Sequence, residues 1–138
     1  MSRFVLDAST VLTWCFPDED AQKAQEISER IASGDTVVVP AFWPHEVLNA
    51  LLVGERRKRV TPDLIQTFIA DLRRLPVTID EQATPDIVFG ETQALCRKHG
   101  LTAYDAAYLE IALRDRYPLA TTDDDLRRAA VAEGVQVL

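Results

Sequence analysis

The hydrophobic residues of this chain fall into short runs separated by longer segments with helical periodicity. Short apolar runs, which are typical of buried strands, occur at 4–6, 37–39, 77–79, 118–121 and 135–137. Helical segments are expected between these runs, at 9–16, 20–33, 42–57, 61–74, 84–99, 104–115 and 124–132. Strands that alternate with helices predict an α/β fold, in which helices cover both faces of a parallel sheet.

Single residues refine some of these boundaries. Ser9 is expected to cap the first helix, and Gly34 to end the second. The segment Pro17-Asp18-Glu19-Asp20 is expected to break the chain between these two helices. The helix at 42–57 has almost no polar face up to residue 53. We therefore expect it to contact both the core and a subunit or partner.

The length and composition indicate one domain, residues 1–138, without a linker. No apolar run approaches the ~20 residues of a membrane helix, and Asp7 interrupts the first run too early for a signal peptide. We therefore expect a cytoplasmic protein with no membrane partner. The net charge of -7 argues against a protein that coats nucleic acid. It leaves room for an enzyme that reaches nucleic acid through metal ions.

Acidic residues follow several of the predicted strands. Asp7 comes directly after the first strand and Asp123 after the fourth, and Glu46 lies one turn into the helix after the second. Because the carboxyl ends of parallel strands share one edge of a sheet, we expect these three acids to gather there. Asp105 opens the helix that precedes the fourth strand, so its position depends on packing.

Helical spacing strengthens this candidate site. Glu46 and Asn49 share one face of an otherwise apolar helix, and Asp105 and Tyr108 share a face of theirs. Carboxylates within ~5 Å of each other repel and raise each other's pKa, and a divalent cation removes that penalty. Mg²⁺ suits an all-oxygen site and can activate a water against a phosphodiester. In the competing structural interpretation, the three aspartates cap helices or close turns, whereas a buried Glu46 needs a partner.

Motifs along nearly the whole chain are similar to those of one family. They are Val5-Leu6-Asp7-Ala8-Ser9, Glu46-Val47-Leu48-Asn49-Ala50-Leu51, Thr102-Ala103-Tyr104-Asp105-Ala106-Ala107-Tyr108 and Leu119-Ala120-Thr121-Thr122-Asp123-Asp124-Asp125-Leu126. In this order the chain resembles a PIN domain, specifically the VapC-type ribonuclease toxins of toxin–antitoxin pairs. The resemblance implies a three-layer α/β/α sandwich with about five parallel strands, and RNA cleavage that depends on Mg²⁺ or Mn²⁺.

The resemblance also implies roles for individual residues. Its acidic quartet, catalytic and metal-binding, falls on Asp7, Glu46, Asp105 and Asp123. Asp7 and Asp105 are the expected direct metal ligands, and Asp124 or Asp125 could share the role of Asp123. Its supporting polar positions fall on Ser9, Asn49 and Thr121.

The partners implied by the resemblance are an RNA substrate, a second copy of the chain and a cognate VapB-type antitoxin. The assembly with antitoxin would be a heterotetramer or larger. The antitoxin's C-terminal segment would lie in a groove beside the acids, which the helices at 42–53 and 61–74 could form. An antitoxin Arg or Lys that reaches the acids would mimic the charge of the cation.

Basic and aromatic residues leave two interpretations open. Arg56-Arg57-Lys58-Arg59 could contact the RNA backbone, or it could be a solvated helix end. Four aromatic residues could stack on bases, although packing in the core or in a dimer is the expected role: Trp14, Phe16, Phe42 and Trp43.

Two other functions remain as alternatives. A haloacid dehalogenase-like phosphatase also begins with a strand that ends in Asp, but it needs a second Asp where this chain has Ser9. The other alternative is a PIN domain without catalytic activity that only binds a partner.

Overall fold

Four parallel strands form the central sheet of the computed structural model, which describes residues 2–16 and 21–138. The strands β1 (Arg3–Leu6), β2 (Thr36–Val39), β3 (Val77–Ile79) and β4 (Leu119–Ala120) pair in the order β3-β2-β1-β4. The apolar runs of β1 and β2 are almost inaccessible to solvent, as expected where helices cover both faces of a parallel sheet. The predicted α/β fold with a parallel sheet is confirmed.

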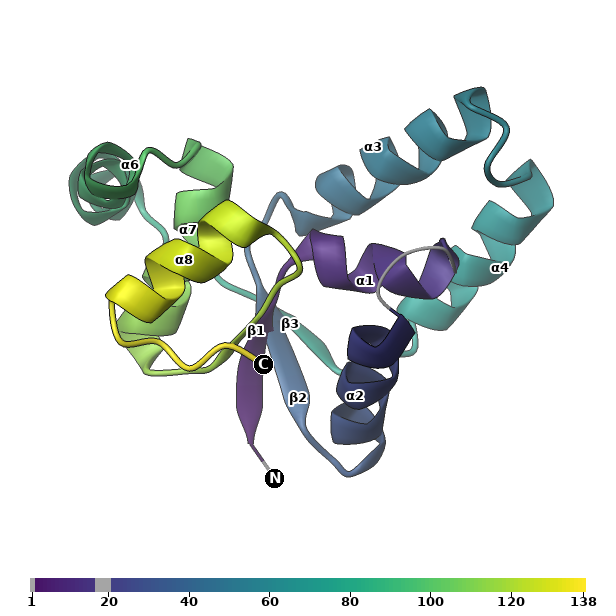
Figure 1. Ribbon diagram of the computed structural model, residues 1–138, viewed down its shortest axis with the longest axis horizontal. Helices are drawn as coiled ribbons and strands as arrows, with labels where there is room; N and C mark the ends of the chain where they lie inside the picture. Colours follow the sequence, from purple (N-terminus) through teal and green to yellow (C-terminus); the bar gives the residue numbers. More distant parts are fainter. Residues whose placement is uncertain (1, 17–20) are drawn as a thin grey trace.

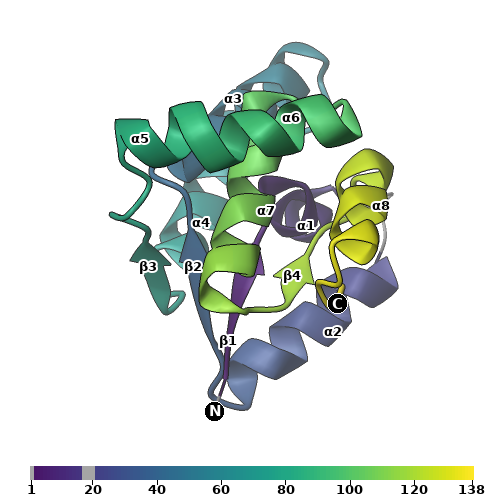
Figure 2. The ribbon, with the colours of Figure 1, turned by 90° about the vertical axis from the view of Figure 1, so that its left-hand side faces the viewer.

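Helices flank the sheet on both sides and complete the three layers (Figures 1 and 2). One side carries α1 (Ala8–Cys15), α2 (Ala21–Ala32), α3 (Trp43–Arg56) and α4 (Pro62–Leu72). The other side carries α6 (Gln93–His99), α7 (Ala103–Asp115) and α8 (Asp124–Ala132). The Pro17-Asp18-Glu19-Asp20 break lies outside the described residues. In the described ranges, no helix has both the length and the apolar character needed to cross a membrane.

The predicted fifth strand is reduced to a single bridge, in which Val137 pairs with Leu119. The backbone bonds from Leu119 N to the Gln136 oxygen (2.9 Å) and from Leu138 N to the Leu119 oxygen (2.9 Å) form this bridge. Because β4 has only two residues, residues 135–137 cannot pair with it over a greater length.

The predicted helix at 84–99 is continuous but changes its pitch. It begins as α5 (Pro85–Ile87), passes through a π-helical turn, η1 (Val88–Thr92), and continues as α6. A π-helical turn accommodates an extra residue within a helix, and such turns are frequent at functional sites. The apolar periodicity of this segment gave no indication of it.

One expectation about the helices needs correction. Ser9 does not cap α1, because the helix begins at Ala8 and the Ser9 hydroxyl bonds to a side chain instead. The α3 helix contacts the core along one face, as expected, and leaves Leu48 on another face 43% exposed. On its buried face Gly54 lies against the ring of Phe16, so closely that a Cβ atom there would come within 2.6 Å of the ring.

Candidate active site

Asp7 is a buried carboxylate held by two hydroxyl groups. It follows β1 directly and is 5% exposed. The register pairs Leu6 with Ala120, which brings Thr121 beside Asp7 at the shared edge of the sheet. Ser9 Oγ and Thr121 Oγ1 each donate a hydrogen bond of 2.7 Å to Asp7 Oδ2. Burial raises the pKa of Asp7, and the two hydroxyls offset part of that rise.

The start of α8 is tied to the same two hydroxyl groups. The backbone N–H of Asp123 donates to Thr121 Oγ1 (3.0 Å), and that of Thr122 donates to Ser9 Oγ (3.1 Å). Asp123 Oδ1 accepts from Leu126 N at 2.9 Å, so this aspartate caps α8 as the structural interpretation expected. It also lies close enough for its charge to raise the pKa of Asp7. Asp123 therefore caps α8 and also belongs to the acidic cluster.

Glu46 is oriented by a tyrosine from another helix. The Tyr108 hydroxyl, on α7, donates a 2.5 Å hydrogen bond to Glu46 Oε1, on α3. Tyr108 itself is fully buried, and its ring meets Phe42 edge-on with 5.8 Å between the ring centroids. Partial burial raises the pKa of Glu46, the Tyr108 bond opposes that rise, and the charge of Asp7 adds to it.

Asp105 shows that the acids act on one another. Its pKa is raised to about 6, first by loss of water and then by the charges of Asp123, Asp7, Glu46 and Asp125. Thr102 Oγ1 accepts from the Asp105 backbone N–H (3.1 Å) and caps α7, so the Asp105 side chain has no capping role. The fold thus brings all four predicted acids to the edge where α1, α3, α7 and α8 begin (Figure 1).

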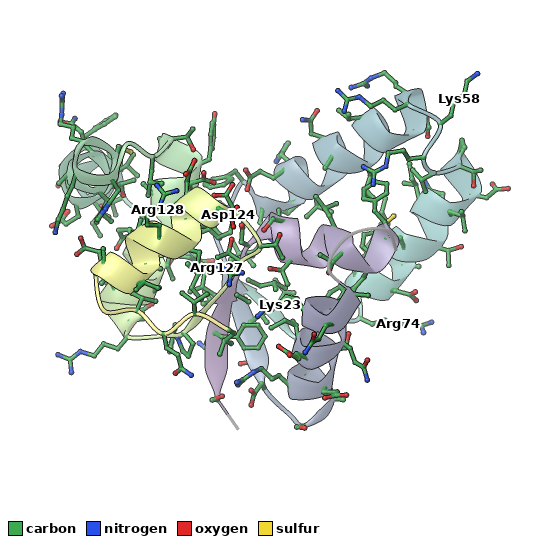
Figure 3. All side chains as sticks on the ribbon, viewed as in Figure 1. Lys23, Lys58, Arg74, Asp124, Arg127 and Arg128 are labelled. Carbon is green, nitrogen blue, oxygen red and sulfur yellow. The ribbon has the colours of Figure 1, made fainter. Side chains whose placement is uncertain are left out.

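Other predicted residues are less closely tied to the acids. Asn49 is exposed on α3, one turn beyond Glu46, and has no hydrogen bond to the described acids. The basic run 56–59 lies at the opposite end of α3 from Glu46, about 15 Å along the helix axis. Figure 3 shows Lys58 there, remote from Asp124 at the start of α8. Arg59 lies over the ring of Phe16, 4.3 Å from its centroid.

The predicted aromatic residues pack mostly inside the protein. Trp43 and Phe16 are buried, and Trp14 Nε1 donates to the Ala24 oxygen at 2.8 Å. The expected core role of these three residues is confirmed. Phe42 is only half-buried, and its ring also contacts Tyr104.

The bond from Tyr108 to Glu46 was not predicted from the sequence. The signal was present, because Tyr108 follows Asp105 by three residues and so lies on the same face of α7. Asp125 also acts on the site, since its charge contributes to the raised pKa of Asp105.

The donor chemistry fits a hard divalent cation such as Mg²⁺ or Mn²⁺. The cluster offers carboxylate and hydroxyl oxygens, which are the ligands that these ions prefer. Burial and then repulsion by the neighbouring acids raise the pKa of Asp105, and a bound cation would relieve the repulsion. As the side chains of the described residues lie, however, no three of them from His, Cys, Asp or Glu are close enough to enclose an ion. The residues fit the cation chemically without forming a closed cage.

Comparisons with known proteins agree with this fold. The model of the PIN domain family matches residues 4–132. Ribonuclease VapC3 of Mycobacterium tuberculosis is 30% identical over 125 residues, which cover 91% of this chain and 85% of the relative. Ribonuclease VapC3 of Pyrobaculum aerophilum is 27% identical over 124 residues, covering 90% of this chain and 92% of the relative.

Solved structures share the whole fold. The crystal structure of PAE2754 from Pyrobaculum aerophilum superposes with a TM-score of 0.72 at 21% identity, covering 99% of this chain and 89% of that one. VapBC2 from Rickettsia felis, bound to a DNA fragment from its promoter, superposes with a TM-score of 0.66 at 13% identity, covering 100% of this chain and 98% of that one. FitAcB from Neisseria gonorrhoeae gives 0.65 at 16% identity, covering 100% of this chain and 96% of that one.

Proposed function

Because the chain belongs to the PIN-domain family, we propose that it is a metal-dependent endoribonuclease of the VapC type, a toxin neutralised by a cognate antitoxin. The observation that supports this most is the convergence of Asp7, Glu46, Asp105 and Asp123, which arrive at one edge of the sheet from different elements. The family match over residues 4–132 favours this function over a haloacid dehalogenase-like phosphatase.

The four carboxylates would hold Mg²⁺ or Mn²⁺, with Asp7 and Asp105 as the main ligands. When bound, the ion would make a water more acidic and neutralise charge on the phosphodiester. Ser9 and Thr121 fix Oδ2 of Asp7 through two hydrogen bonds, so the carboxylate cannot rotate freely. Tyr108 restrains Glu46 in the same way. These neutral donors orient the acids without neutralising them.

The antitoxin would occupy the groove between α3 and α4. This groove encloses about 470 Å³, and its apolar lining includes Val47, Leu48, Ile69 and Leu72. An amphipathic segment could bury its apolar face there, beside the helix that carries Glu46. The solved structures named VapBC2 and FitAcB share the fold of this chain, which we also expect to form a homodimer.

The decisive experiment measures RNA cleavage by the purified protein, free of antitoxin, with Mg²⁺ or Mn²⁺. We expect cleavage that EDTA abolishes and that Asp7→Asn reduces to background. Asp71→Asn, which changes an exposed acid of α4, is the matched control and should cleave as wild type does. If Asp7→Asn cleaves as well as wild type, the proposed site is wrong. A protein without any cleavage would support the alternative of a PIN domain that only binds a partner.

A further inference from the structure

A second pocket lies beside the acids and takes no part in the mechanism above. It encloses about 490 Å³, within the range of roughly 300–1,000 Å³ that is typical of small-molecule sites. Its walls come from the segments that follow β2 and β3, from the π-helical turn η1 and from the first turns of α7. Figure 2 shows α5 and α6 crossing over α7, next to the segment after β3. The pocket thus opens near the sheet edge that carries the acids.

One helical turn separates this pocket from the acids. On α7, Ala103, Tyr104 and Ala107 line the pocket, whereas Asp105 and Tyr108 face the acidic cluster. Phe42 connects the two sides. Its ring meets Tyr104 edge-on with 5.2 Å between the centroids, and Tyr108 in the same manner at 5.8 Å.

The lining suits a planar aromatic ligand. Tyr104 is 60% exposed, an unusual position for a large aromatic side chain, and its ring meets that of Phe42. The remaining wall is largely apolar and includes Pro40, Ile79 and Val88. An exposed aromatic ring at the rim of an apolar pocket is the arrangement with which proteins stack unpaired RNA bases.

The polar groups of the pocket favour a ligand that donates hydrogen bonds. Asp80 and Glu110 are both bonded to Arg114, through Nη1 to Asp80 Oδ1 (2.8 Å) and Nη2 to Glu110 Oε1 (2.6 Å). Glu81 remains as an exposed carboxylate that can accept from an occupant. A carboxylate accepts N–H groups from a base, as in its pairing with the amino group of cytosine.

We propose that this pocket binds one unpaired nucleobase of the RNA substrate, with Tyr104 stacking on the base and Glu81 accepting from its amino group. This proposal rests on the proposed ribonuclease function and adds a source of sequence selectivity to it. A phosphodiester held at the acids would place a neighbouring base on the other side of the α7 turn. Bases with an amino group, above all guanine with its two adjacent donors, should be preferred to uracil.

The test combines Tyr104→Ala with RNA oligonucleotides that carry a single abasic ribose at each position in turn. Wild type should lose binding or cleavage at one position, by roughly 5- to 150-fold for the loss of one stacked base. Tyr104→Ala should show a similar loss on intact RNA and no further loss when that same position is abasic. Tyr104→Phe keeps the ring and should behave as wild type does. Glu81→Gln should reduce the preference for guanine over uracil at that position.

Each failure has a distinct meaning. If wild type cleaves RNA but Tyr104→Ala loses equally on intact and abasic RNA, the pocket does not bind a base. If Tyr104→Ala leaves RNA cleavage unchanged and alters the oligomeric state in size-exclusion chromatography, the pocket is an interface between copies and the proposal is wrong. If wild type cleaves no RNA at all, the proposed function fails first, and with it the premise of this proposal.

Discussion

Replacing Asp105 by Asn should stabilise the folded protein at neutral pH, because it removes a carboxylate whose ionised form is disfavoured first by burial and then by the neighbouring acids. The pKa of Asp105 rises from an ordinary value of 3.8 to about 6 in the folded protein. A rise of that size corresponds to about 3 kcal/mol of unfavourable free energy once the group is ionised. Because the side chain is only half-buried, solvent screens part of this, and we expect a gain of about 1–2 kcal/mol.

The pH dependence has a definite sign. Between pH 3.8 and about 6 the folded protein holds the Asp105 proton more tightly than the unfolded chain does, so the stability of wild type falls as the pH rises through this window. The penalty is complete above about pH 6 and absent well below pH 3.8. The advantage of Asp105→Asn should therefore be full at about pH 7.5 and mostly lost by about pH 4.5.

Urea denaturation at these two pH values measures the effect directly. The free energy of unfolding of Asp105→Asn should exceed that of wild type by much more at the higher pH than at the lower, whereas Asp71→Asn should match wild type at both. Added Mg²⁺ or Mn²⁺ should stabilise wild type more than Asp105→Asn, since the cation relieves a repulsion that the variant lacks. An equal gain at both pH values, or no gain at the higher one, would refute the argument that burial and the neighbouring acids raise this pKa.

Two further changes test the packing around the site. Thr121→Val removes one of the two donors to the buried carboxylate of Asp7, and we expect the free energy of unfolding to fall by roughly 1–3 kcal/mol, as measured by urea denaturation. Unchanged stability would mean that Ser9 alone satisfies Asp7. Gly54→Ala forces a methyl group against the Phe16 ring and should cost about 1–3 kcal/mol, seen as a lower thermal midpoint. A midpoint equal to that of wild type would show that the ring moves aside freely.

The parts of the site that could be predicted follow from topology. Asp7 follows β1 directly and Asp123 lies in the short turn after β4, so the pairing of these adjacent parallel strands brings the two acids to the same edge. Asp105 could not be placed in this way, because its position depends on how α7 packs against the sheet. The π-helical turn at η1 has no periodicity of its own, and without it the pocket beside Tyr104 could not be foreseen.

Hydroxyl partners were the least predictable feature. Ser9 has the residue type and position of a helix cap, yet its hydroxyl bonds to Asp7, because Thr121 and Asp7 meet it across the sheet edge. Thr121 lies more than a hundred residues after Asp7 in the sequence, and no local sequence pattern predicts their contact. Tyr108 could have been inferred from its spacing to Asp105, but its partner Glu46 comes from α3, whose orientation only the tertiary structure sets.

Two groups of acids in this chain have different kinds of partner, and the difference fits a structural role for one group and cation binding for the other. Asp80 and Glu110 share the guanidinium of Arg114, and this pairing holds the segment after β3 against α7. In the part of the chain that the structure describes, the acids of the candidate site bond instead to hydroxyls and backbone N–H groups: Ser9, Thr121, Tyr108 and Leu126. An arginine there would offset part of the negative charge of the cluster and weaken its affinity for a cation. Neutral donors fix the carboxylates and preserve their negative charge. A site for a divalent cation needs that charge, whereas a structural ion pair does not.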